Sequence, residues 1–217
     1  MHVIIDNGHG VDTKGKRSPD NQLREYAWAR DVAQKLKCKL EAAGVKCTML
    51  VPEEEDISLK KRCARANAIT AEHGVANCVL VSIHCNAAGA DNQWHTAGGW
   101  SAYTSRGTTN ADKLATMLYD AAQEHLRDYS AQMEAGKLAG KYDTKQRAFR
   151  TDYTDGDVDQ EAGFYILQHT RCAAVLTENL FQDNRGDVLY LLSAKGKDNI
   201  VNLHYDGIMR YINSMEG

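Results

Sequence analysis

The chain has 217 residues, of which 25% are charged and 43% hydrophobic, with 17 Gly, 2 Pro and a formal net charge of -3. These values are typical of a globular domain and exclude collagen-like, coiled-coil and disordered classes of protein. The absence of a basic excess argues against a dedicated nucleic-acid binder, and no apolar run approaches the ~20 residues that span a bilayer.

The first half of the chain alternates short apolar runs with longer amphipathic ones. Val3 to Ile5 predicts a strand, which ends at the loop Asp6-Asn7-Gly8-His9-Gly10. Ser18 and Pro19 predict the N-cap and first position of a helix that Gly44 ends. The further elements predicted in this half are a strand over 45–51, a helix capped by Ser58 and ended by Gly74, and an apolar strand over 78–83.

The second half continues this alternation, with one irregular stretch. The predicted elements are a strand over 100–103, a helix over 111–126, strands over 163–167 and 173–177, and helices near 183–192 and 197–212. Residues 129–163 show no clear period and are expected to hold loops or a hairpin over the site. They carry an acidic run from Asp152 to Asp159. Its part near Asp155 to Asp159 is a candidate for calcium binding, but it lacks the spacing of a calcium loop and is interpreted as a solvated turn. Strands alternating with helices predict an α/β fold with helices on both faces of one sheet.

The N-terminus and the cysteines bear on where the protein resides. The first residues lack the basic and apolar regions and the cleavage site of a signal peptide. No two of the six cysteines form a CxxC pair, so they are interpreted as small buried thiols rather than a disulfide framework. They are Cys38, Cys47, Cys63, Cys78, Cys85 and Cys172.

Polar side chains follow three of the predicted strands, where such a sheet presents its sites. His9 follows the first strand, His84 the strand over 80–83, and Glu178 the strand over 174–177, while Glu25 lies in the opening turns of the first helix. Two imidazoles and a carboxylate make a three-ligand zinc set with an open position for water, and a second carboxylate suits metal-assisted hydrolysis. Each feature also has a structural explanation, since a glutamate near a helix start is favoured by the helix dipole.

The order of short motifs along the chain carries a family resemblance. They are DNGHG after the first strand, Glu25, Leu59…Arg62…Ala66-Asn67, Ser82-Ile83-His84-Cys85-Asn86-Ala87, and Ala174-Val175-Leu176-Thr177-Glu178-Asn179-Leu180-Phe181 with Asn184. Over residues 2–213 the chain resembles the catalytic domain of zinc-dependent N-acetylmuramoyl-L-alanine amidases. These enzymes cleave the amide between the lactyl group of N-acetylmuramic acid and L-alanine in peptidoglycan. The chain departs from the family's usual residues at Asn7 (Pro), Val11 (Gly) and Leu180 (Gly), positions that affect loop shape.

The resemblance implies a fold, a cofactor and residue roles. It implies a mixed, mostly parallel sheet with flanking helices, one Zn²⁺ per chain held by His9, Glu25 and His84, and Glu178 as the catalytic carboxylate. His95 and Asn86 are the candidates for substrate contact. The expected partners are peptidoglycan or muropeptides, with no nucleic acid and no membrane insertion.

The organisation of the chain suggests how such an enzyme would be used. A single catalytic domain over residues 1–217 is expected, without a separate cell-wall-binding domain. Together with the lack of a signal peptide, this indicates a phage-type lysin released from the cytoplasm, or an exported autolysin whose signal has been removed.

Three other functions compete with this interpretation. Cys85 beside His84 suggests a thiol nucleophile, but adjacent residues of a strand point to opposite faces and cannot form a dyad. A zinc exopeptidase of related architecture remains an alternative, and it would cleave free peptides that lack muramic acid. A non-catalytic wall-binding module is the third, although the presence of all three ligand candidates with Glu178 argues against it.

Overall fold

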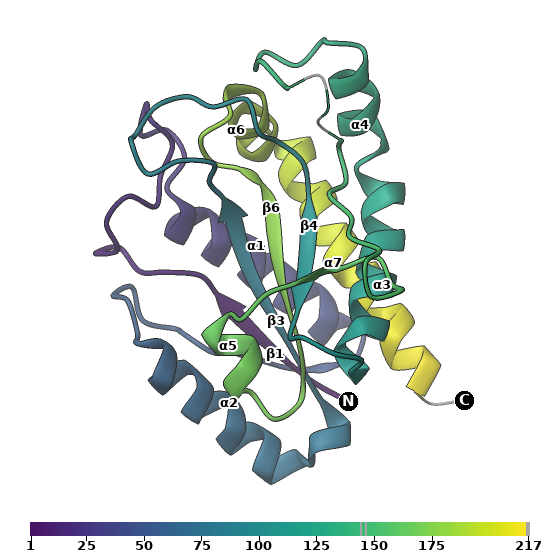
Figure 1. Cartoon of the computed structure of the whole chain (residues 1–217). Coiled ribbons are helices and arrows are strands. Elements are labelled where there is room, and N and C mark those ends of the chain that lie inside the picture. Colours follow the sequence, from purple (N-terminus) through teal and green to yellow (C-terminus); the bar gives the residue numbers. More distant parts are fainter. Residues whose placement is uncertain (144, 146, 216–217) are drawn as a thin grey trace.

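The apolar runs of the sequence form one six-stranded sheet in the computed structural model, which describes residues 1–143, 145 and 147–215 (Figure 1). In chain order the strands are β1 (His2–Asn7), β2 (Lys46–Met49), β3 (Cys78–Asn86), β4 (Ser101–Thr104), β5 (Gln160–Glu161) and β6 (Ala173–Phe181). Their spatial order is β2-β1-β3-β6-β4-β5. Only β4 and β6 pair antiparallel, whereas the other neighbouring strands pair parallel. This confirms the expected α/β domain with a mixed, mostly parallel sheet.

Helices cover both faces of this sheet, as the alternation of elements predicts (Figure 1). The described helices are α1 (Glu25–Ala42), α2 (Leu59–His73), α3 (Asn110–His125), α4 (Arg127–Glu134), α5 (Tyr165–His169), α6 (Arg185–Leu192) and α7 (Ala194–Met215), with a short 3-10 turn at Val75–Asn77. The larger apolar core lies between the sheet and α1, α3 and α7, and the smaller one lies between the sheet and α2 and α5. None of the described helices combines the length and apolar character that crossing a membrane requires.

Alternation along the central strand β3 decides which side chains face which core. Val81 and Ile83 pack into the larger core, and Leu80 packs into the smaller one. Cys85 continues the first set and is 3% exposed in the larger core. His84 therefore faces the side covered by α2 and α5, which agrees with the argument that His84 and Cys85 cannot act together.

The first helix begins later than its sequence signals suggest. Ser18 and Pro19 were expected to cap it, but α1 begins at Glu25, and residues 18–23 form a closed loop. The Ser18 N–H donates to the Leu23 carbonyl, and the Leu23 N–H donates to Ser18 Oγ. Since these groups are paired across the loop, they cannot also make helical hydrogen bonds. The prediction of a helix start at Ser18 was wrong, and its correction places Glu25 in the first turn.

Two further predictions need correction in the second half of the chain. The strand expected over 163–167 is wrong: residues 165–167 begin α5, which buries Ile166 and Leu167 in the smaller core beside α2. The stretch 129–163 was expected to hold loops or a hairpin, but α4 extends into it with Tyr129 and Met133 buried one helical turn apart. Residues 144 and 146 of this stretch lie outside the described residues.

All six cysteines are free, with Cys38 exposed, Cys47 half-buried and the other four buried. Burial raises the pKa of the Cys172 thiol to about 11 and that of Cys85 well above its ordinary value. A buried thiol reacts slowly because the thiolate is the reactive form. We expect thiol titration of the unfolded, unreduced protein to find six thiols, and titration of the native protein to show rapid reaction of Cys38. Recovery of three disulfides would contradict this expectation.

Candidate active site

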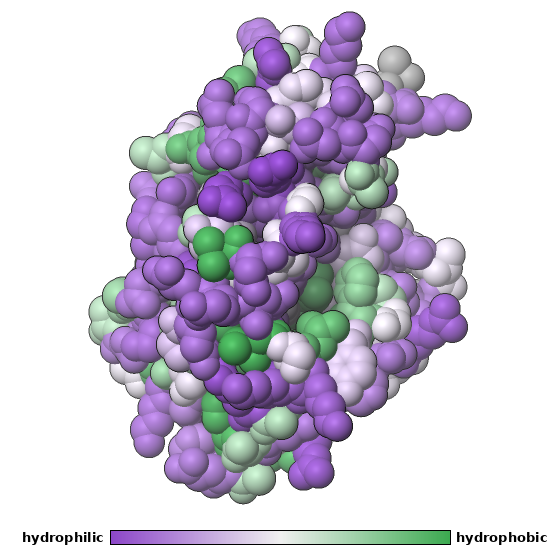
Figure 2. Space-filling view, turned by 90° about the vertical axis from the view of Figure 1, so that its left-hand side faces the viewer, coloured by the Kyte–Doolittle hydropathy of each residue, from purple (hydrophilic) through white to green (hydrophobic). Residues whose placement is uncertain are grey.

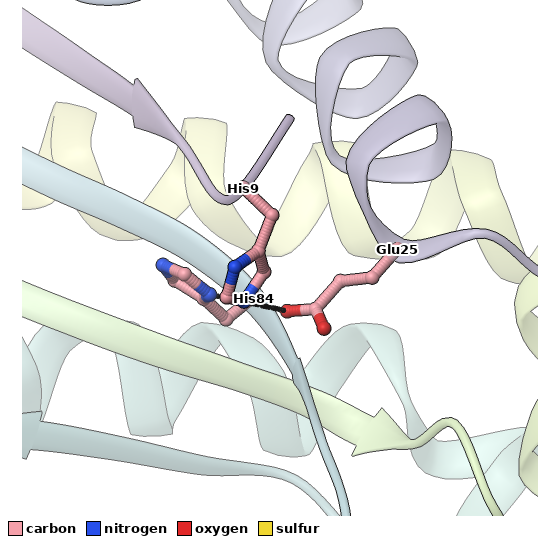
Figure 3. Close-up of side chains that lie close together, drawn as sticks. All are labelled: His9, Glu25 and His84. Atoms are coloured by element: carbon pink, nitrogen blue, oxygen red, sulfur yellow. Dashed lines mark hydrogen bonds and ion pairs between the residues drawn. The ribbon is translucent and has the colours of Figure 1, made fainter. Parts of the chain in front are cut away.

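Three side chains from separate elements converge at one edge of the sheet. His9 lies in the loop after β1, His84 lies near the end of β3, and Glu25 is the first residue of α1. Figure 3 shows the two imidazole rings and the carboxylate pointing toward one another. Glu25 Oε1 is 3.1 Å from His84 Nδ1 and 3.3 Å from His9 Nε2. The sequence analysis predicted that these three residues share a site, and the structure brings them together.

The spacing of these donor atoms fits a tetrahedral metal site. Ligands about 2.0–2.1 Å from a tetrahedral zinc lie roughly 3.3 Å from one another, close to the separations found here. Oε1 is the carboxylate oxygen of Glu25 that faces both imidazoles, whereas Oε2 is buried without a hydrogen-bond partner. Two imidazoles with one carboxylate form a three-ligand set of the kind that leaves a fourth position open. The residues present therefore fit a zinc ion.

Local backbone features aim the two histidines. A Cβ at Gly8 would lie 2.4 Å from His84 Cε1, so only glycine leaves room for the ring of His84. His9 has a φ of 60°, in the left-handed region that a non-glycine residue rarely adopts. Its carbonyl accepts hydrogen bonds from Arg30 and Arg62, which hold this conformation and fix the direction of the ring. The end of β1 and the loop that carries His9 are thus held by two arginines, Arg30 of α1 and Arg62 of α2.

Glu25 has no solvent exposure and is held ionised by its neighbours. Burial opposes its ionisation, but hydrogen bonds with His84 and His9 outweigh burial and hold the pKa of this carboxyl well below its ordinary value. The backbone N–H of Cys85 also donates to Oε1 at 3.0 Å. A carboxylate that stays charged and in a fixed position is suited to holding a cation.

Glu178 lies on β6 directly beside His84 of β3, as register partners in the sheet. Neighbouring strands run about 4.8 Å apart, so the two side chains lie on the same face and close together. Burial raises the pKa of Glu178 to about 7, while the charges of His84 and Lys16 act in the opposite direction. Its Oε2 atom is buried without a hydrogen-bond partner. A dication held by the neighbouring ligands would favour the ionised form of Glu178 and so lower its pKa.

A cavity of about 530 Å³ opens beside these groups. Its polar lining consists of Asp6, His9, Thr13, Lys16, Asp56, Ser58, Arg62, His84 and Glu178. Its other walls are largely apolar and come from the loop before α2, from α2 and α5, and from β6; they include Ile57, Leu59, Phe164, Tyr165, Ile166 and Leu176. Figure 2, which looks onto the left-hand side of Figure 1, shows hydrophobic side chains gathered around a hollow in a mainly hydrophilic surface. Such a cavity suits a substrate that presents both polar and apolar groups.

Arg62 organises the loop that carries His9, a role the sequence did not reveal. It is 2% exposed, and its guanidinium donates to Asp6 Oδ1 at 2.7 Å and to the carbonyls of Asn7 and His9. It also donates to Asp56 Oδ1 and the Ile57 carbonyl at the rim of the cavity. Sequence reasoning included Arg62 in the family pattern without a function, because its carboxylate and carbonyl partners in residues 6–9 come near it only when the chain folds.

We expect Arg62→Met to destabilise the protein by about 3–5 kcal/mol, since the change leaves the buried Asp6 carboxylate unpaired. Chemical unfolding followed by circular dichroism measures this change. Arg65→Met is the matched control one turn of helix further, because Arg65 pairs with the half-exposed Glu53 and such pairs contribute only about 0–1 kcal/mol. Equal effects of the two substitutions would contradict the assigned role of Arg62.

The remaining candidates lie apart from this cluster. His95 pairs with Asp91 at 2.8 Å, and Asn86 accepts from the Ala87 N–H in its own turn. Neither is among the residues that line the cavity. Sequence reasoning missed Lys16, Phe164 and Tyr165, which do line it. The polar character of the loop after β1 was the one sequence feature that pointed to Lys16 as a site residue. No local sequence pattern indicated that Phe164 and Tyr165 line the cavity.

Leu180 shows how the chain accommodates one departure from the family's usual residues. Its φ is 62°, a conformation that favours glycine, and the register between β3 and β6 shifts at this point. Its side chain is fully buried in the larger core, so packing there offsets a strain on the order of 1–2 kcal/mol. The departure is confined to the backbone after Glu178 and leaves the site residues unchanged.

Comparisons with known proteins agree with this geometry. A family model described as N-acetylmuramoyl-L-alanine amidase matches residues 3–210. Among curated proteins, the chain is similar to the endolysin of Bacillus phage SPP1, with 24% identity over 213 residues. The match covers 97% of this chain and 66% of that endolysin, so the chain spans just under two thirds of this relative's length.

Solved structures share the fold. An N-acetylmuramoyl-L-alanine amidase from Clostridium difficile 630 superposes with a TM-score of 0.74 and 23% identity, covering 98% of this chain and 97% of that one. The N-acetylmuramoyl-L-alanine amidase AmiC2 of Nostoc punctiforme gives a TM-score of 0.72 and 19% identity, covering 98% and 97%. In both comparisons the shared fold covers nearly the whole of this chain.

Proposed function

The chain belongs to the N-acetylmuramoyl-L-alanine amidase family, and from this premise we propose that it is a zinc-dependent hydrolase of peptidoglycan. The bond cleaved is the amide between the lactyl group of N-acetylmuramic acid and L-alanine. The observation that carries the proposal is the convergence of His9, Glu25 and His84 beside Glu178, at one cavity of a chain that the family model matches over residues 3–210.

His9, Glu25 and His84 are the proposed ligands of one zinc ion per chain. When bound, zinc supplies a Lewis acid that polarises a carbonyl and lowers the pKa of water. The three side chains need little rearrangement to hold it, since their donor atoms already have the separations of tetrahedral ligands. Such preorganisation reduces the free energy that the protein spends on forming the site.

Glu178 is the proposed general base and acid. It accepts a proton from the water that attacks the lactyl carbonyl and passes this proton to the departing alanine nitrogen. Proton transfer by a positioned side chain contributes roughly 10²–10⁴-fold to the rate. Two features of Glu178 support this role: it lies beside His84 in the sheet, and its Oε2 has no partner that would compete for the proton.

The proposed partners are peptidoglycan or its muropeptides, and the proposed setting is a lysin that acts on the cell wall. The similarity to a phage endolysin supports this setting. The apolar wall formed by Phe164 and Tyr165 offers a surface for the non-polar parts of a stem peptide or sugar, and Lys16 offers a cation for its carboxylates. His95 and Asn86 remain candidates for contact with parts of the substrate beyond the cavity.

Mass spectrometry of purified muropeptides tests the proposal. Digestion is expected to release a stem peptide with a free L-alanine N-terminus and an intact disaccharide, to stop when a chelator is added, and to resume with zinc. A free peptide without muramic acid is the control substrate and should remain uncut. Cleavage of that peptide would identify an exopeptidase, and binding to the wall without any cleavage would identify a non-catalytic module.

A further inference from the structure

Three aspartates form a second candidate cation site, far along the chain from the zinc ligands. Asp112 lies in the first turn of α3, and Asp157 and Asp159 lie in the segment that leads into β5. One carboxylate oxygen from each lies within 4.8 Å of the others. The acidic run that contains Asp157 and Asp159 was expected to be a solvated turn, but Asp159 is only 1% exposed, so that interpretation was wrong at this residue.

One buried oxygen in this cluster has no partner. Asp159 Oδ2 accepts a hydrogen bond from Thr104 Oγ1 at 2.6 Å, whereas Asp159 Oδ1 is buried without any hydrogen bond. Burial raises the pKa of the Asp159 carboxyl above its usual range, and the neighbouring Asp157 carboxylate adds to this effect. None of the three aspartates forms an ion pair with a Lys or Arg side chain among the described residues. A buried carboxylate oxygen without a donor is costly, and a cation is the partner that would remove this cost.

We propose that Asp112, Asp157 and Asp159 bind a calcium ion. Three carboxylates are hard oxygen ligands, which calcium prefers over nitrogen and sulfur. Oxygens bound to one calcium ion at about 2.3–2.6 Å lie at most roughly 5 Å apart, so three carboxylate oxygens within 4.8 Å of one another can share an ion.

The position of this site gives the ion a structural effect on the active-site cavity. Asp159 directly precedes β5, and Phe164 and Tyr165 of the cavity wall follow β5 closely. Phe164 also packs on Tyr103 of β4, with ring centroids 5.2 Å apart. Calcium would tie the β4–β5 edge to the start of α3, two parts of the chain that pass each other in Figure 1, and so hold this wall in place.

Terbium luminescence competed by calcium tests the site, with the full chain in metal-free buffer at a pH above 7. Tyr119 can sensitise terbium, since its hydroxyl accepts a hydrogen bond from the Ala102 N–H, two residues before the Thr104 that contacts Asp159. We expect saturable terbium binding that calcium displaces, together with a rise in the thermal midpoint on addition of calcium. Asp159→Asn keeps the shape of the side chain and the acceptor for Thr104, but it should weaken binding by about 10-fold or more.

Matched variants decide the outcome. Asp155→Asn removes an exposed charge from the same run and should leave terbium binding unchanged. Asp157→Asn, at a half-buried position, should weaken binding and provides the test if Asp159→Asn fails to fold. His84→Ala keeps all three aspartates and should bind terbium normally, which separates this site from the zinc ligands. Absence of saturable binding in the unmodified chain, or equal binding by the Asp155→Asn and Asp159→Asn variants, would overturn the proposal.

Discussion

Glu178→Gln is expected to lower amidase turnover by roughly 10²-fold or more while the protein keeps its fold and its zinc. Glutamine preserves the size of the side chain and some of its hydrogen bonding, but it cannot accept the proton. The loss should fall on kcat more than on KM, because proton transfer matters chiefly in the transition state. Kinetics on a purified muropeptide, circular dichroism and metal analysis of the same preparation measure the three quantities together.

Two results would revise the role of Glu178. Loss of zinc from Glu178→Gln would make Glu178 a ligand, and near-normal activity would mean that another group moves the proton. Glu72→Gln is the control, since this glutamate lies at the exposed end of α2, away from the cavity, and its substitution should leave turnover unchanged.

His84→Ala is expected to lose most of its zinc. The substitution removes one of the three proposed ligands. Changing a residue that only supports a metal ligand typically lowers metal affinity by about 10–100-fold, so removing a ligand should lower zinc affinity by at least that much. It also leaves the buried Glu25 carboxylate with fewer hydrogen-bond donors, so the thermal midpoint should fall. Metal analysis after dialysis against zinc of known concentration measures the first effect, and calorimetry measures the second.

A second histidine provides the comparison for this experiment. His125 at the end of α3 pairs with Asp206 of α7, outside the zinc cluster. His125→Ala should therefore retain zinc at the level of the unmodified protein. Full retention of zinc by His84→Ala would exclude the ligand set of His9, Glu25 and His84.

The sequence predicted the fold class, which the structure confirms, and, with the family resemblance, it supplied the proposed zinc ligands. Apolar residues recur with a different spacing in strands than in amphipathic helices. This spacing distinguishes strands from helices before any contact between them is known. The helix over α2 was placed closely because Ser58 accepts from the Lys61 N–H at its start and Gly74 ends it. His9, His84 and Glu178 were identified because they follow apolar strands, although His84 and Glu178 prove to lie within the last residues of β3 and β6.

Other features were decided only by the tertiary structure, because they depend on residues distant in sequence. Glu25 reaches His84 only because residues 18–23 close into a loop that delays the start of α1. Arg62 donates hydrogen bonds to the carbonyls of Asn7 and His9, which are more than fifty residues away in the sequence. Such contacts leave no periodic signal, since they involve single side chains rather than a repeating face.

Burial of charge is the clearest case in which the sequence was insufficient. The acidic run before β5 has the composition of a solvated turn, yet folding places Asp159 against Thr104 and away from water. Sequence fixes the number of carboxylates, but the exposure of each depends on which neighbours the fold packs over it. The active-site cavity follows the same principle: its polar groups were visible as strand-end residues, whereas the wall containing Phe164 and Tyr165 exists only because α5 packs on the α2 face of the sheet.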